Sequence, residues 1–203
     1  MQSVTGTRRT QEQRRSEMRE RLLDATIESL LEDGYAATTL RAVAARAGVS
    51  SGAMTHHFPR RVDLVGAAVD SLTEQRIARF HSAELPSGAR RLTRAILDLV
   101  WEDFSSDVFR VAVKLWVAAD DDPELAERLE PMERLVAGEI ARVVAELGGD
   151  RPRAEVAAIA TTVLATIRGL ALTDAFLPGG GRSPEKQWAL VRPVLEGLLL
   201  PAS

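Results

Sequence analysis

Apolar residues recur along the chain at helical spacing, and no run alternates as a half-buried β-strand would. Glycines and prolines divide this pattern. The first helix ends at Gly34, the second runs from a Thr38-Thr39 cap through Ala47 to Gly48, and the third runs from a Ser50-Ser51 cap to about Phe58. Further helices are predicted over 61–83, 88–105, 107–119, 123–147, 152–176 and 184–200. The pattern therefore predicts an all-α protein of about nine helices.

Two of these helices carry strong start signals, and one carries a break. Asp122-Pro123-Glu124 and Ser183-Pro184-Glu185 each place a cap, a proline at the first helical position and an acid at the positive end. Pro131 is expected to kink or interrupt the 123–147 helix, because proline donates no backbone hydrogen bond.

Length and composition narrow the class of protein. The 203 residues suffice for one or two compact domains, and the absence of cysteine excludes disulfides, cysteine zinc sites and a thiol nucleophile. The polar N-terminus lacks the apolar core of a signal peptide, and the uncharged run between Glu155 and Arg168 is too short to span a bilayer. We therefore expect a soluble, cytoplasmic protein with no membrane partner.

Charge is divided unevenly within a net charge of −3. Residues 1–61 hold ten arginines against seven acids, and the stretch from Ala36 to Arg61 holds four arginines and no acid. A basic N-terminal quarter in an acidic protein indicates either a polyanion partner or an ordinary solvated face, and charge alone leaves both open.

The second and third helices, joined by a tight turn, have the form of a helix-turn-helix, in which the second helix enters the major groove of DNA. Apolar residues at 40, 43, 44, 47, 49, 54 and 58 supply a small core. The residues left facing outward are Arg41, Ser50, Ser51, Gly52, Ala53, Thr55, His56 and His57. Periodicity alone leaves a simple helical corner in an ordinary bundle as an equal alternative.

Residues 22–64 resemble the DNA-binding domain of the tetracycline-repressor (TetR) family. The resemblance lies in the ordered motifs G-Y-A-A-T-T, A-x-x-A-G-V-S and G-x-x-x-H-H-F-P, followed by a basic residue and D-L. Two positions depart from the family pattern: Thr55 stands where tyrosine is usual, and Arg61 where lysine is usual. The first departure removes an aromatic contact to DNA, whereas the second keeps the positive charge.

The resemblance implies residue roles and an organisation. It places Ser50, Ser51, Gly52, Ala53, Thr55 and His56 at the groove, and Thr39, His57 and Arg61 on phosphates. It divides the chain into a helix-turn-helix domain (1–61) and a helical ligand-binding and dimerisation domain (62–203). It implies a homodimeric repressor that a small-molecule effector releases from a palindromic operator in double-stranded DNA. Arg8, Arg9, Arg14 and Arg15 form an arm ahead of the first helix, which either reaches a minor groove or stays disordered.

No catalytic constellation is found. His56 and His57 point about 100° apart on a helix, and His81 with Glu84 supplies too few ligands for zinc. No phosphate loop, nucleophile elbow or dinucleotide fingerprint occurs. We expect no enzyme activity, metal or cofactor. The alternative is an all-helical enzyme or ligand-binding scaffold with no DNA role.

The last two helices are predicted to form the dimer interface, because the first carries small residues and the second an excess of apolar ones. The predicted interface residues are Thr162, Ala165, Thr166, Gly169, Val191, Val194, Leu195 and Leu198. Burial of these residues inside a monomer is the alternative.

An effector pocket is predicted where large side chains gather in a chain that is only 4% aromatic. Its predicted lining is Trp101, Phe104, Phe109, Trp116, Met132 and Phe176. Ordinary core packing is an equal alternative for each one. The nearest basic residues are few, which favours an apolar, neutral or weakly anionic ligand.

Overall fold

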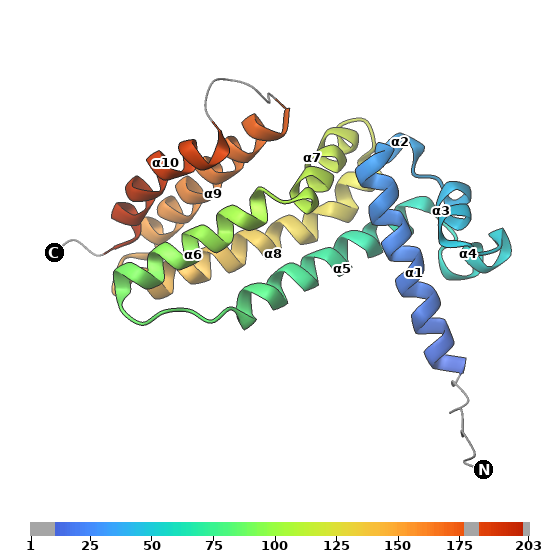
Figure 1. Cartoon of the computed structure of the whole chain (residues 1–203), viewed down its shortest axis with the longest axis horizontal. Coiled ribbons are helices and arrows are strands. Elements are labelled where there is room, and N and C mark those ends of the chain that lie inside the picture. Colours follow the sequence, from blue (N-terminus) through green and yellow to red (C-terminus); the bar gives the residue numbers. More distant parts are fainter. Residues whose placement is uncertain (1–10, 177–182, 201–203) are drawn as a thin grey trace, which may run out of the picture. The chain divides into compact units, whose positions relative to one another are not determined.

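The computed structural model of the chain describes residues 11–176 and 183–200, and for residues 174–176 it describes the backbone alone. Ten α-helices and no strand occur within these ranges (Figure 1). The chain divides into two compact units, 1–71 and 72–203. This division falls ten residues later than the boundary expected from the sequence, because the first half of the fifth helix packs with the N-terminal unit.

The N-terminal unit contains α1 (Gln11–Glu32), α2 (Gly34–Ala37), α3 (Leu40–Ala47), α4 (Ser51–His57) and the start of α5 (Arg61–Ser82). Its core joins side chains from four of these helices: Leu22, Leu23 and Ala25 of α1, Val43 and Ala44 of α3, Met54 of α4, Leu64, Ala67 and Ala68 of α5, and Phe58 between α4 and α5. The short helix α2 was not predicted. It arises because Gly34, at φ +79°, ends α1 and a single further turn follows.

The second unit contains the rest of α5, then α6 (Ala89–Phe104), α7 (Asp107–Ala119), α8 (Pro123–Gly148), α9 (Arg153–Phe176) and α10 (Pro184–Leu199). These bounds lie within a residue or two of the predicted ones. Asp122 and Ser183 cap α8 and α10 by accepting from the backbone N–H of Leu125 and Lys186. The helix α8 continues through the exposed Pro131, so the predicted interruption is absent.

The core of the second unit is built around α9 and α10. Trp101 of α6 stacks on Trp188 of α10, with ring centroids 5.1 Å apart and planes 6° apart. The indole N–H of Trp188 donates to Asp98 at 2.7 Å, and Arg192 donates to the same carboxylate at 2.9 Å. This polar contact fixes α10 against α6 beside the stacked indoles.

One helix leaves much apolar surface uncovered. From Arg153 to Thr173, α9 is long and apolar enough to cross a membrane by length and composition alone, but only 22% of its most apolar window is buried within the chain. This stretch was not predicted from the sequence, because Arg168 interrupts its uncharged run. The exposed side of α9 carries Thr162, Ala165 and Gly169.

Candidate functional site

The geometry of α3 and α4 is fixed by two local caps and one glycine. Thr39 Oγ1 accepts from the backbone N–H of Ala42 at 3.1 Å, and Ser50 Oγ accepts from that of Ala53 at 3.2 Å. Gly48, at φ +66°, ends α3 in the left-handed region that favours glycine. Two residues, Val49 and Ser50, separate Gly48 from α4, which gives the tight turn that a helix-turn-helix requires.

The residues predicted to read DNA lie on the outside of this unit. Thr39, Arg41, Ser50, Ser51, Gly52, Thr55 and His56 are exposed, whereas Ala53, His57 and Arg61 are half-buried. Thr55 Oγ1 donates to the backbone carbonyl of Ser51 at 2.8 Å, which occupies its hydroxyl within the helix. A Cβ built on Gly52 meets no atom within 4 Å, so the fold itself does not require glycine at this position.

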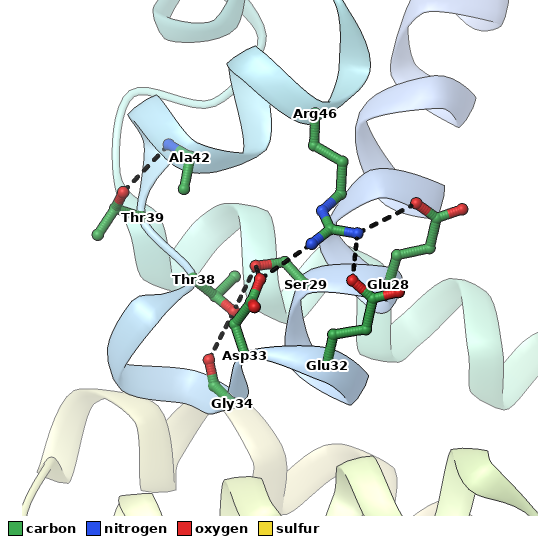
Figure 2. Close-up of polar contacts among 9 residues, drawn as sticks. All are labelled: Glu28, Ser29, Glu32, Asp33, Gly34, Thr38, Thr39, Ala42 and Arg46. Atoms are coloured by element: carbon green, nitrogen blue, oxygen red, sulfur yellow. Dashed lines mark hydrogen bonds and ion pairs between the residues drawn. The ribbon is translucent and has the colours of Figure 1, made fainter.

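The arginines of the acid-free stretch are not equally available for a polyanion. Arg46 of α3 donates to Glu32 at 2.7 Å and to Asp33 at 3.0 Å, and Glu28 lies 3.7 Å away (Figure 2). The hydrogen bond that Arg46 donates to Glu32 is the main reason that the pKa of Arg46 is raised. Acids that are distant in sequence therefore neutralise Arg46.

The same polar cluster ties α1 to the segment before α3. The buried hydroxyls of Ser29 and Thr38 lie 3.1 Å apart, and Thr38 Oγ1 donates to the carbonyl of Gly34 at 2.8 Å (Figure 2). Thr38 is thus a structural residue, and Thr39 is the cap.

Two further arginines are also engaged within the chain. Arg60 donates two hydrogen bonds to Asp63, at 2.8 and 2.9 Å. The Arg61 guanidinium lies 3.7 Å from the centroid of the Tyr35 ring and donates to the Tyr35 carbonyl. Arg41 is exposed, and within the described residues no ion pair or hydrogen bond joins it to another group. Of the four arginines, Arg41 is therefore the one best placed to meet an external anion.

The predicted arginine arm is partly wrong. The helix α1 begins at Gln11, so Arg14 and Arg15 lie on a helix rather than in an arm ahead of it. Arg8 and Arg9 lie outside the described residues.

A cavity lies within the second unit between α5, α6 and α8. Its walls are mainly apolar, with Ile77 and Phe80 from α5, Val100 and Phe104 from α6, and Val136 and Ile140 from α8 among the lining residues. Four charged residues also border it, and all four are paired. Arg76 pairs with Asp103, whose carboxylate also lies 3.9 Å from Arg79. Glu139 accepts from Arg142 at 2.9 Å and contacts His81 at 3.2 Å.

The Glu139 cluster shows how these charges balance. The hydrogen bond from Arg142, assisted by that from His81, holds the pKa of Glu139 below its ordinary value despite partial burial. The walls therefore present two arginines and two carboxylates that already have partners. An uncharged apolar molecule fits this environment best, since a charged one would have to displace a partner.

The residues predicted to line the effector pocket are divided between this cavity and the core around it, and their contact with a ligand stays a prediction. Phe104 lines the cavity, but Trp101, Phe109, Trp116 and Met132 do not. Trp101 is stacked on Trp188. Phe109 makes edge-to-face contacts with Phe104 and Trp116, and the ring centroids lie 5.0 and 5.7 Å apart. The side chain of Phe176 lies outside the described residues. The missed residues carry a signal of their own, because Val136, Ile140, Val143 and Leu147 recur at helical spacing along α8.

One predicted interface residue is also placed differently. Leu195 is only 2% exposed and belongs to the core cluster with Trp101 and Trp188, because it faces inward from α10. Val194 and Leu198, on the other side of α10, are 65% and 38% exposed, and Val191 is half-buried.

No group of three potential metal ligands occurs in the part of the chain that the structure describes.

Comparison with known proteins decides the family. Residues 22–68 match the model for bacterial regulatory proteins of the tetR family. Residues 88–200, more than half of the chain, match the C-terminal domain of BetI-type transcriptional repressors. The chain belongs to the TetR family. The match to the C-terminal model extends the resemblance well beyond the DNA-binding half from which the sequence first indicated it.

Individual proteins that are similar to this TetR-family protein are also transcriptional regulators by name. The HTH-type transcriptional regulator CymR of Pseudomonas putida is 38% identical over 125 residues, 61% of each chain. The chain spans about three fifths of the length of CymR and of the Mycobacterium bovis regulator that it matches. The regulator BetI of Burkholderia thailandensis is 29% identical over 90% of this chain and 94% of its own. A transcriptional regulator from Rhodococcus has a similar fold, with a TM-score of 0.65, 28% identity and coverage of 89% of this chain and 91% of its own.

Proposed function

We propose that this TetR-family protein is a cytoplasmic, homodimeric repressor that binds a palindromic operator and leaves it when a small apolar ligand occupies the cavity of the second unit. The observation that carries the proposal is the capped α3–α4 pair, whose exposed face is free of acids and whose sequence belongs to the family's DNA-binding domain. It is not proposed to be an enzyme.

In this proposal α4 enters the major groove. Ser51, Gly52, Ala53, Thr55 and His56 meet base edges, and the methyl of Thr55 is left for an apolar contact because its hydroxyl is used within the helix. Thr39, Arg41 and His57 contact phosphates. Arg61 mainly holds Tyr35, so its contribution to phosphate binding is indirect.

The dimer is proposed to form through α9 and α10. The exposed small residues of α9, namely Thr162, Ala165 and Gly169 with the half-buried Thr166, let a partner helix approach closely. The exposed Val194 and Leu198 of α10 supply apolar area beside them. Two copies of this helix pair about a two-fold axis would cover the apolar surface that one chain leaves open, and would present two copies of α4 to a palindrome.

A selection experiment tests the proposal. The full chain is incubated with a random pool of duplexes, and retained sequences are read after several rounds. The expected result is one inverted repeat, bound by two chains, with an affinity that falls steeply as salt rises. Recovery of no common sequence, together with binding that does not respond to salt, would refute the DNA-binding role. It would favour the alternative of an all-helical ligand-binding scaffold with no DNA role.

The effector is tested separately with an uncharged apolar dye such as Nile red. Binding of the dye in the second unit should release the selected duplex. Dye binding with no change in DNA affinity would contradict the proposed release while leaving the repressor role intact.

A further inference from the structure

The N-terminal half of α1 makes almost no contribution to the core of its unit. Between Gln11 and Arg21 every residue is exposed except Met18, which is half-buried, and the first buried residue of the helix is Leu22. About three turns of helix therefore extend past the hydrophobic core. Ordering these residues as a helix costs conformational entropy, and the exposed segment buries almost no apolar area to offset that cost. The segment therefore calls for another explanation.

After the first turn, which carries Glu12, the charges on this part of α1 are separated by face. At 100° per residue, Arg15 and Arg19 continue the face on which Leu22 and Thr26 are buried further along the helix. The acids Glu17, Glu20 and Asp24 lie on the opposite face, and Glu12, in the first turn, is the one acid of these turns on the arginine face. The side of α1 that turns toward the rest of the helix-turn-helix unit is therefore basic where it leaves the core.

Contacts place this basic side next to the end of α4. The Arg19 guanidinium lies 5.2 Å from the centroid of the Phe58 ring, directly after α4. The pKa of His57 is lowered first by burial and then by the positive charges of His56, Arg15 and Arg19, and no acid opposes them. Arg15 and Arg19 are thus close enough to His57 for their charges to act on it.

Neither arginine is neutralised in the way that Arg46 is. Within residues 11–176 and 183–200, no ion pair joins Arg15 or Arg19 to a carboxylate. Like charges held side by side without a counter-ion repel one another, and an external anion relieves that repulsion.

We propose that Arg15 and Arg19 of α1, together with His57 of α4, form a phosphate-binding strip that extends the DNA-contacting surface beyond the helix-turn-helix. The proposal rests on the DNA-binding function proposed above. The partner is the DNA backbone, because the strip is continuous with the acid-free surface of α4 and opposite to phosphate in charge. Such contacts set position and affinity, and they carry no sequence information.

The test compares substitutions on the two sides of α1 in the full-length protein. Arg15→Gln/Arg19→Gln removes the strip, and Arg21→Gln removes a charge from another face of the same turns. Affinity is measured by fluorescence anisotropy at several salt concentrations, for a duplex selected by the wild-type protein and for a mixed-sequence duplex. The double variant should lose about two units of the log–log salt slope for each protomer bound, and Arg21→Gln should keep the wild-type slope.

Two further readouts separate the strip from a merely structural role. The double variant should weaken binding to both duplexes by the same factor, so its preference for the selected duplex stays unchanged. Arg15→Lys/Arg19→Lys keeps both charges and should restore the slope. Unfolding by urea is measured alongside, and an unchanged midpoint is expected because the substituted residues are outside the core.

The outcomes are distinct. A double variant with the wild-type slope, while Arg41→Gln lowers it, would overturn the strip and leave the helix-turn-helix function standing. An altered sequence preference would also overturn it, because the two arginines would then contact bases. Absence of salt-dependent binding in the wild-type protein would instead refute the proposed function itself.

Discussion

Leu195→Ala tests whether α10 is divided into an inward-facing and an outward-facing side. Leu195 is 2% exposed and packs in the core of the second unit, so truncation leaves a cavity beside Trp101 and Trp188. A buried Leu→Ala change costs about 2–5 kcal/mol, and in a chain of this size each kcal/mol lowers the melting temperature by roughly 2–4 °C. The expected loss is therefore about 4–20 °C.

Leu198→Ala is the matched control. It makes the same chemical change one turn away, at a residue that is 38% exposed and lies in the proposed dimer interface. Melting is followed by circular dichroism over a wide range of protein concentration, since the stability of a dimer depends on concentration whereas that of a folded subunit does not. Leu195→Ala should lower the midpoint equally at all concentrations, and the effect of Leu198→Ala should fade upon dilution. If the effect of Leu195→Ala fades instead, the assignment of Leu195 to the core is refuted.

Four other outcomes are expected. Gly52→Ala should leave thermal stability unchanged or raised, since a Cβ there meets no atom, but should weaken operator binding in anisotropy assays; equal binding would show that α4 does not approach DNA closely. Ile140→Trp should fill the cavity and abolish Nile red binding while operator binding persists, and retained dye binding would place the ligand elsewhere. DNA phosphates should raise the lowered pKa of His57, so operator affinity should increase as pH falls through the histidine range. His57→Gln should flatten this pH dependence of operator affinity, and an unchanged pH profile in the variant would exclude a contact of His57 with phosphate. Asp98→Ala leaves the indole N–H of Trp188 without its acceptor and should cost about 1–3 kcal/mol in urea unfolding, with a shift in tryptophan emission; a neutral effect would contradict the role of this contact.

The helical architecture could be predicted because its signals are local. Gly48, Ser50 and the Asp122-Pro123 start each act through the backbone of their own turn, so the sequence placed these helix ends within a residue or two. The exposure of Ser51, Gly52, Thr55 and His56 on α4 could be predicted for the same reason, since it follows the helical period. Their contact with DNA stays a prediction.

The cavity was less accessible to prediction because it depends on which helices meet. Trp101 and Phe109 are conspicuous in a chain poor in aromatics, yet they fill the core, and Val136 and Ile140 line the cavity although nothing in composition distinguishes them. Leu195 likewise shares an apolar helix end with Leu198, and only the packing of α10 against its neighbours separates the two roles. Charge pairing across helices was equally hidden, as in Arg76 with Asp103.

The neutralisation of Arg46 by acids at and directly after the end of α1 has an evolutionary consequence. Glu28 and Glu32 of α1, and Asp33 directly after it, lie outside the helix proposed to contact bases, yet they set how much positive charge α3 presents. Substitution of any of them by a neutral residue would expose more of the Arg46 charge and strengthen attraction to every DNA sequence alike. Selection on the time that the protein spends on non-target DNA is therefore expected to act at these three positions. The residues of α4 that are proposed to contact bases would stay unchanged.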